Sequence, residues 1–260
     1  MDLYFEIGHA NAYSSGLQRA RVLTEPWVAS QVYCPNCGSF PLMRYPNNSR
    51  IGDFYCSACR ENYELKSKRA LFGDKVDDGA YRAMLWRISG NANPNLFLLN
   101  YNVGSLAVTD LVIIPKHFFT TGMIEERAPL SPTARRKGWI GCRILLKSIP
   151  HSGRIAIIRN GVIERKAVVL DRWQRTLFLR KQRDLEAKGW LVQVMRCIER
   201  IGKNQFTLDE VYAFEDELKA AYPGNSHMRA KIRQRMQVLR DNGYLEFLGR
   251  GNYRLARAAV

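Results

Sequence analysis

Three charged residues in this chain of 260 residues have the types and the spacing to hydrolyse a phosphodiester. Ten residues separate Asp53 from the tripeptide Glu64-Leu65-Lys66. Two carboxylates suit Mg²⁺, which polarises a phosphate, and an adjacent lysine can orient or help to deprotonate the attacking water. Metal-dependent nucleases use this arrangement. The same residue types also occur by chance on a solvated strand face, so the pattern needs support from the rest of the chain.

These side chains meet only if the chain forms a hairpin between them. Successive residues of a strand point to opposite faces, so Glu64 and Lys66 share a face while Leu65 turns toward the core. A short turn allows two antiparallel registers, with Asp53 opposite Asn62 or opposite Glu64, and both place Asp53 on that same face. We therefore expect the catalytic residues to be Asp53, Glu64 and Lys66, and the Mg²⁺ ligands to be Asp53, Glu64 and the Leu65 carbonyl.

Four cysteines form two Cys-x-x-Cys pairs, the first before this segment and the second within it. Eighteen residues separate the pairs, which is within the spacing of a four-cysteine zinc site. Because four thiolates close the coordination sphere, we expect a structural Zn²⁺, with redox-active or unpaired thiols as the alternative. The second pair also falls where the hairpin must turn, so the zinc site would hold the catalytic strands in register. The predicted zinc ligands are Cys34, Cys37, Cys56 and Cys59.

The chain is strongly basic, with 40 Lys and Arg residues, 24 Asp and Glu residues and a net charge of +16. This charge favours a polyanionic partner, first of all nucleic acid. An anionic membrane is the alternative, but the sequence has neither a basic amphipathic anchor helix nor an apolar run of about 18 residues. The N-terminus lacks a signal-peptide pattern, so we expect a cytoplasmic protein whose thiols are reduced, with Cys142 and Cys197 as small buried hydrophobes.

The first 182 residues have the pattern of an α/β domain. Apolar residues at helical spacing predict helices over residues 17–31 and 77–89, the second with Asp77 and Asp78 at its N-terminus. Short apolar runs predict buried strands over residues 96–101, 111–114, 143–146 and 154–159.

Beyond residue 183 the pattern changes to that of a winged helix-turn-helix. Helical periodicity predicts three helices, and Thr207 and Glu210 form a capping box at the start of the second. Two short strands joined by a glycine-rich turn follow, which is the element order of a winged helix. We therefore divide the chain into an α/β domain of residues 1–182 and a DNA-binding domain of residues 183–260, with helices at 183–201, 207–221 and 227–241.

Basic residues are concentrated in one acid-free stretch of the first domain. Residues 127–159 contain eight Lys and Arg residues and no Asp or Glu. A solvated surface normally mixes both signs, so this stretch is better explained as a surface that faces phosphates. Its central cluster is Arg135, Arg136 and Lys137.

The third helix of the second domain combines an apolar stripe with outward polar residues. Ile232, Met236 and Leu239 recur at helical spacing and predict its buried face. Arg and Gln side chains can read base edges or contact only phosphate. The residues expected to face outward are Arg229, Lys231, Arg233, Gln234, Arg235 and Gln237. Among them, and at the wing tip, our DNA-binding candidates are Arg229, Arg233, Gln234, Gln237 and Arg250.

These features together resemble the PD-(D/E)xK nuclease superfamily and, within it, the DpnI-like family of methyl-directed type II restriction endonucleases. The resemblance covers nearly the whole chain. It departs from the superfamily motif at Gly52, where the motif name has a proline that ligates nothing. The matching segments are Arg21-Val22-Leu23-Thr24-Glu25, Tyr33-Cys34-Pro35-Asn36-Cys37-Gly38, Asp53-Phe54-Tyr55-Cys56, Glu64-Leu65-Lys66-Ser67-Lys68, Pro132 to Cys142, Gln237-Val238-Leu239-Arg240-Asp241 and Gly249-Arg250-Gly251.

The resemblance implies a monomeric, Mg²⁺-dependent endonuclease that cuts double-stranded GATC when its adenine carries an N-methyl group. It also implies that both domains read the methylated sequence, and that Trp139 matches the family's methyl-contacting tryptophan. A methyl group in the major groove is a small apolar feature, and an aromatic side chain can bury it. The alternative for Trp139 is a packing role in the core.

Two other functions compete with this interpretation. A non-catalytic zinc-containing regulator would need the winged helix and the basic charge, but it has no use for Asp53, Glu64 and Lys66 on one face. A repair or recombination nuclease would share the catalytic core and differ in specificity. Cleavage of methylated and unmethylated DNA separates all three.

Overall fold

The computed structural model describes residues 1–6, 15–182 and 184–256, and its N-terminal part is built on a seven-stranded mixed sheet. Only β3 and β5 pair in parallel; the other neighbours are antiparallel. The mixed α/β fold expected from the sequence is confirmed. In spatial order the strands are β1 (Met43–Arg44), β2 (Phe54–Tyr55), β3 (Asn62–Lys68), β5 (Asn95–Asn102), β6 (Ala107–Ile114), β9 (Ile155–Arg159) and β10 (Val162–Ile163).

The central strand β5 is buried on both faces, as its continuous apolar run predicted. Leu96 and Leu98 join one hydrophobic cluster, whereas Phe97 and Leu99 join the other. The second cluster also contains residues of the helices α1 (Gly16–Gln31) and α3 (Lys166–Gln174), so both helices cover the same face of the sheet. Helix α1 matches the expected helix and contains Pro26 within it.

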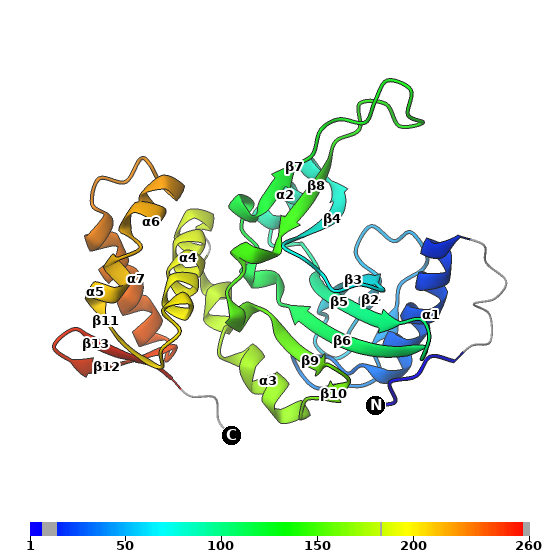
Figure 1. The fold of residues 1–260 in the computed structure, drawn as a ribbon, viewed down its shortest axis with the longest axis horizontal. Helices are drawn as coiled ribbons and strands as arrows, with labels where there is room; N and C mark the ends of the chain where they lie inside the picture. Colours follow the sequence, from blue (N-terminus) through cyan, green and yellow to red (C-terminus); the bar gives the residue numbers. More distant parts are fainter. Residues whose placement is uncertain (7–14, 183, 257–260) are drawn as a thin grey trace.

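A smaller three-stranded sheet in the order β4-β8-β7 lies against the other cluster. Between β7 and β8 the chain forms a loop, residues 127–140, that projects from the body (Figure 1). The strands are β4 (Lys75–Ala80), β7 (Ile124–Glu126) and β8 (Gly141–Leu145). Cys142 on β8 is fully buried, as is Cys197 in the C-terminal part, which confirms their expected role as small hydrophobes.

The helix expected over residues 77–89 is wrong in its first part. Asp77 and Asp78 lie in β4, and the helix α2 (Tyr81–Ser89) begins only after Ala80. The cause is pairing with a strand distant in the sequence, because β4 runs antiparallel to β8, with Asp78 opposite Cys142. A pairing of this range overrides the local preference for acids at a helix N-terminus.

The C-terminal part is a winged helix whose helices surround a hydrophobic core beside a small sheet in the order β11-β13-β12. The expected single helix over residues 207–221 is two helices, since the chain breaks at Phe214 before three acids that favour a new helix N-terminus. The capping box of Thr207 and Glu210 is confirmed. The elements are α4 (Leu185–Ile201), β11 (Gln205–Thr207), α5 (Leu208–Tyr212), α6 (Glu215–Ala221), α7 (Met228–Asp241), β12 (Leu245–Gly249) and β13 (Asn252–Leu255).

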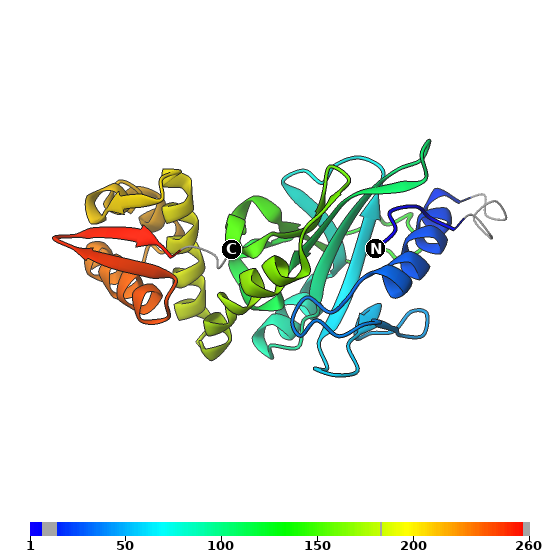
Figure 2. The ribbon, with the colours of Figure 1, turned by 90° about the horizontal axis from the view of Figure 1, so that it is seen from below.

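The two parts form adjacent lobes that share apolar and polar contacts (Figures 1 and 2). One hydrophobic cluster runs from Leu98 and Phe118 of the first part to α4 and α7 of the second. Glu199 on α4 accepts backbone hydrogen bonds from His151 and Ser152. Position 183, where we expected the boundary and the start of a helix, lies outside the described residues. Within the described part of the chain, no helix has the length and apolar character needed to cross a membrane.

Candidate active site and metal centre

The hairpin of β2 and β3 brings Asp53 next to the Glu64-Leu65-Lys66 tripeptide. Phe54 pairs with Tyr63 and Tyr55 with Asn62, a register that ends at Phe54, the residue next to Asp53. It is one of the two registers expected from the sequence. The Asp53 carboxylate accepts a hydrogen bond of 2.7 Å from the Leu65 backbone N–H, so one of its oxygens is fixed to the strand that carries the tripeptide.

Gly52 fits this close approach of the two strands. A Cβ atom at position 52 would lie 2.8 Å from the backbone oxygen of Tyr63, which is shorter than real Cβ contacts. The Asp53 N–H donates to the same Tyr63 oxygen at 2.8 Å. The departure from the proline of the motif name is therefore compatible with the hairpin, because glycine leaves room for the neighbouring carbonyl.

Lys66 forms ion pairs with two carboxylates. Its Nζ lies 2.7 Å from Glu64 Oε1 on the same strand and 2.8 Å from Asp78 Oδ1 on β4. Burial by itself would lower the pKa of Lys66, but the charges of Glu64 and Asp78 outweigh it and hold that pKa above its usual value. Leu65 packs against the hydrophobic core on the other face, as the alternation of the strand predicted.

Asp78 is a site residue that the sequence did not identify. Its side chain is 10% exposed and reaches the site from the smaller sheet. Burial would raise the pKa of Asp78, yet the ammonium of Lys66 lowers it overall. Burial and the charge of Asp78 raise the pKa of Glu64.

A second buried acid, Glu25 on α1, lies near Asp53. Its two oxygens form ion pairs of 2.6 Å with Arg21 and Arg44. Burial raises the pKa of Asp53, and the negative charge of Glu25 raises it further. The hydrogen bond from the Leu65 N–H lowers this pKa and so opposes both effects. Sequence reasoning also missed Glu25, although it lies within one of the segments that carry the family resemblance.

The donor set at the hairpin fits a hard cation such as Mg²⁺. Asp53 and Glu64 offer carboxylate oxygens, and Mg²⁺ is commonly held by one or two carboxylates with waters completing its shell. Three carboxylates do not converge here, since the only group of three or more Cys, His, Asp or Glu among the described residues whose ligand atoms lie within 4.8 Å of one another is the cysteine cluster. The site thus offers two protein carboxylates, and water or substrate oxygens would complete the shell of a bound ion.

The four predicted cysteines form that cluster. The Sγ atoms of Cys34 and Cys59 are 3.5 Å apart, and those of Cys37 and Cys56 are 3.6 Å apart. Four sulfurs at this separation can surround one tetrahedral Zn²⁺ without leaving an open position. Burial raises the pKa of Cys34 and of Cys59, so zinc binding would release protons from the cluster.

Each cysteine pair sits on a tight turn of the same design. The N–H of Gly38 donates to the Cys34 carbonyl at 2.8 Å, and the N–H of Arg60 donates to the Cys56 carbonyl at 2.9 Å. Both donors have positive φ angles, 79° at Gly38 and 61° at Arg60. The second turn connects β2 to β3. The cysteine cluster therefore closes the hairpin that carries Asp53 and Glu64.

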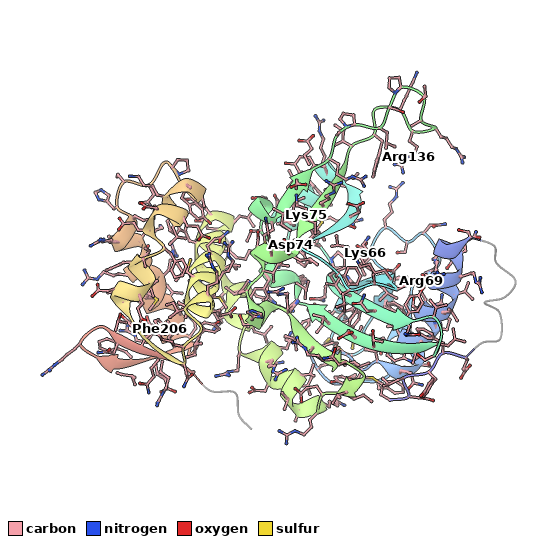
Figure 3. The ribbon with its side chains drawn as sticks, in the orientation of Figure 1. Lys66, Arg69, Asp74, Lys75, Arg136 and Phe206 are labelled. Atoms are coloured by element: carbon pink, nitrogen blue, oxygen red, sulfur yellow. The ribbon has the colours of Figure 1, made fainter. Side chains whose placement is uncertain are left out.

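The projecting loop of residues 127–140 carries the central basic cluster of the first part. Arg135, Arg136 and Lys137 are exposed, and Figure 3 labels Arg136 on the loop and Lys66 in the body below it. Trp139 is half-buried under the Arg136 guanidinium, 4.6 Å from its ring centre, and lies outside both hydrophobic clusters. The alternative of a core tryptophan is therefore wrong.

Helix α7 and the wing expose the second group of candidates. The packing stripe of Ile232, Met236 and Leu239 is fully buried, as expected. Arg235 corrects our expectation, because it is 7% exposed and packs inward instead of facing solvent. The exposed candidates are Arg229, Arg233, Gln234 and Gln237 on α7 and Arg250 in the wing turn.

These candidates lie on a different lobe from the hairpin, so the structure does not gather the two groups into one site (Figure 1). Arg229 is also engaged within its own lobe. It forms an ion pair of 2.8 Å with Glu215 and lies over the ring of Tyr212. The other candidates on α7, namely Arg233, Gln234 and Gln237, take part in none of the side-chain hydrogen bonds among the described residues.

Comparison with known protein families gives a match for each lobe. Residues 1–182 match the family model named DpnI and described as the Dam-replacing family. Residues 186–255 match a second model, described as the Dam-replacing helix-turn-helix domain. Together the two matches span both the hairpin with its cysteine cluster and the winged helix.

Proposed function

Since this chain belongs to the DpnI, or Dam-replacing, family, we propose that it is a methylation-dependent type II restriction endonuclease. It cleaves double-stranded DNA at GATC sites with methylated adenine, by Mg²⁺-dependent hydrolysis of the phosphodiester. The observation that carries the proposal is the hairpin that unites Asp53, Glu64 and Lys66, with Asp53 hydrogen-bonded to Leu65.

In this reaction the oxygen of water bonds to phosphorus and one P–O ester bond breaks, leaving a phosphate monoester and a hydroxyl. Asp53, Glu64 and the Leu65 carbonyl would hold the Mg²⁺. When bound, the ion supplies a positive charge that polarises the phosphate. Lys66 would orient the attacking water and stabilise the negative charge that develops on the phosphate oxygens. A buried site makes these electrostatic effects stronger than they are in water.

The proposed specificity is divided between the two lobes. Trp139 would bury the adenine methyl group, while Arg135, Arg136 and Lys137 bind phosphates beside it. The exposed residues of α7 and Arg250 would contact the DNA from the second lobe. We place the division between a nuclease domain and a winged-helix domain at residues 182 and 183, and propose that the protein acts as a cytoplasmic monomer.

We propose that the four cysteines bind a structural Zn²⁺. The ion would cross-link the turn at Cys34 and Cys37 to the hairpin turn at Cys56 and Cys59. This cross-link would stabilise the pairing register of β2 and β3. Its contribution to catalysis is indirect, through the position of Asp53 relative to Glu64.

The decisive experiment compares plasmid DNA from adenine-methylating and non-methylating hosts. Purified protein is incubated with each plasmid in the presence and absence of Mg²⁺. We expect cutting of methylated DNA only, at GATC sites, and only with Mg²⁺. If neither plasmid is cut, the proposal is refuted in favour of a non-catalytic DNA-binding regulator. If both plasmids are cut equally, the protein is a nuclease with a different specificity.

A further inference from the structure

We propose that Asp78 is a positioning residue that holds Lys66 in its active orientation, an inference that rests on the proposed nuclease function. Asp78 lies on β4, in a different sheet from the hairpin, and its carboxylate is 2.8 Å from Lys66 Nζ. No other acid outside the tripeptide forms an ion pair with Lys66 among the described residues.

The argument starts from the two partners of Lys66. Glu64 is on the same strand, and its Oε1 forms one of the two ion pairs. Glu64 is also a proposed Mg²⁺ ligand, and a carboxylate that ligates a cation has less negative charge left for a neighbouring ammonium. Asp78 then becomes the main anchor of Lys66. Without it, a side chain with four rotatable bonds would sample many positions around the scissile phosphate.

Asp78 itself is held firmly in place. Its strand β4 pairs with β8, and its cross-strand neighbour Cys142 is fully buried. Val76, two residues earlier, belongs to the hydrophobic cluster beneath the smaller sheet. Because the strand is held in this way, the Asp78 carboxylate reaches Lys66 from a defined backbone position.

The neighbouring residue Asp77 connects the same strand to the base of the projecting loop. Its carboxylate forms an ion pair of 3.0 Å with Arg143 on β8. It forms a second ion pair, of 3.2 Å, with Arg127, which is the first residue of the loop. Adjacent residues of β4 thus contact Lys66 and the base of the loop that carries Trp139. The strand that positions the lysine is also the strand that supports the proposed methyl-reading loop.

The test uses Asp78→Asn, which keeps the shape of the side chain and removes its charge, and Asp78→Glu, which keeps the charge. Asp74→Asn is the matched control, since Asp74 precedes β4, is exposed, and uses its carboxylate in no hydrogen bond or ion pair among the described residues (Figure 3). Cleavage is measured in single turnover at saturating Mg²⁺ and DNA. Affinity for methylated DNA is measured separately with Ca²⁺ in place of Mg²⁺.

We expect Asp78→Asn to slow cleavage by about a hundredfold, because displacing a catalytic group by about 1 Å has this effect. DNA affinity should stay within about twofold, and Asp78→Glu should recover part of the rate. Asp74→Asn should match the wild type. In the Lys66→Met background, Asp78→Asn should cause no further loss, since residues that act through one another are non-additive. If Asp78→Asn slowed cleavage by the same factor in the wild type and in the Lys66→Met background, the proposal would be overturned.

A measurement on the metal-free protein keeps this test independent of the proposed activity. Acetylation of Lys66 by acetic anhydride is followed by mass spectrometry of its peptide. We expect several-fold faster labelling of Lys66 in Asp78→Asn than in the wild type or in Asp74→Asn, with other lysines unchanged. Because Glu64 also pairs with Lys66 in the metal-free protein, the comparison is repeated in the Glu64→Gln background. Unchanged labelling in both backgrounds would show that Asp78 does not hold Lys66, whether or not the wild type cleaves DNA. Absence of cleavage by the wild type would instead refute the proposed function.

Discussion

The Asp53 carboxylate accepts the backbone N–H of Leu65 at 2.7 Å, across a hairpin whose turn contains Cys56 and Cys59. One oxygen of Asp53 is therefore tied to the residue between Glu64 and Lys66. The geometry of the proposed Mg²⁺ site depends on the register of two strands, and the cysteine cluster lies at the end where that register is set. The second cysteine pair of the cluster and the proposed Mg²⁺ ligands therefore belong to the same hairpin.

The first prediction concerns Asp53→Asn. The amide oxygen can still accept the Leu65 N–H, so the hairpin should persist while one anionic Mg²⁺ ligand is lost. We expect cleavage to fall by on the order of 10²- to 10³-fold while affinity for methylated DNA, measured with Ca²⁺, stays within about twofold. Asp241→Asn is the control, because Asp241 is an exposed acid at the end of α7. A variant that retains activity would show that the metal is held elsewhere.

The second prediction concerns the proposed structural zinc. Cys56→Ser removes one of four thiolates, so bound zinc should fall from about one ion per chain to near zero, and the unfolding temperature should fall with it. Cys197→Ala is the matched control, because Cys197 is fully buried but lies outside the cluster. Zinc is measured by mass spectrometry and unfolding by calorimetry. A Cys56→Ser protein with full zinc content and activity would contradict the structural role.

The hairpin and the cysteine cluster were predictable from the sequence because both follow short-range rules. The period of two along a strand fixes which of Glu64, Leu65 and Lys66 share a face, and the Cys-x-x-Cys spacing fixes the two turns. The buried strands β5 and β6 were visible as apolar runs for the same reason. These rules predicted the hairpin of the candidate site and three of its residues, Asp53, Glu64 and Lys66.

Asp78 was not predictable because its place in the site depends on a partner far along the chain. The segment looks like a helix start, with two acids before an apolar helical pattern, and only its pairing with β8 turns it into a strand. The prediction that Arg235 faces outward was wrong for a similar reason, since its burial depends on tertiary packing that helical periodicity cannot show. Residues whose roles depend on tertiary pairing leave no local signal.

The third prediction concerns Trp139→Ala and the preference for methylated DNA. Burial of one methyl group contributes about 0.8 kcal/mol, which corresponds to roughly a fourfold difference in binding. We expect the ratio of affinities for methylated and unmethylated DNA to fall by about that factor. Trp86→Ala is the matched control, because Trp86 is 74% exposed on α2, outside the loop. An unchanged ratio in Trp139→Ala, measured by fluorescence anisotropy, would remove Trp139 from methyl recognition.

The fourth prediction concerns His117 and the pH dependence of stability. His117 is fully buried, with Nε2 2.8 Å from the Thr176 hydroxyl and Nδ1 accepting from Arg180 at 3.3 Å. Burial, followed by the charges of Arg180, Lys188 and Lys116, lowers the pKa of His117 well below 6.5. The folded protein thus keeps the ring neutral at a pH where the unfolded chain takes up a proton.

This difference makes stability fall as the pH drops below 6.5. Above pH 6.5 His117 is neutral in both the folded and the unfolded state. Below pH 6.5 only the unfolded state binds the proton, so the free energy of unfolding falls by up to about 1.4 kcal/mol per pH unit because of this residue. The fall ends when the pH reaches the pKa of His117 in the folded state. His117→Gln should therefore lower stability at pH 7.5 but flatten its decline between pH 7 and 5. The exposed His227→Gln is the control. Parallel denaturation midpoints for the wild type and His117→Gln across this range would contradict the buried neutral histidine.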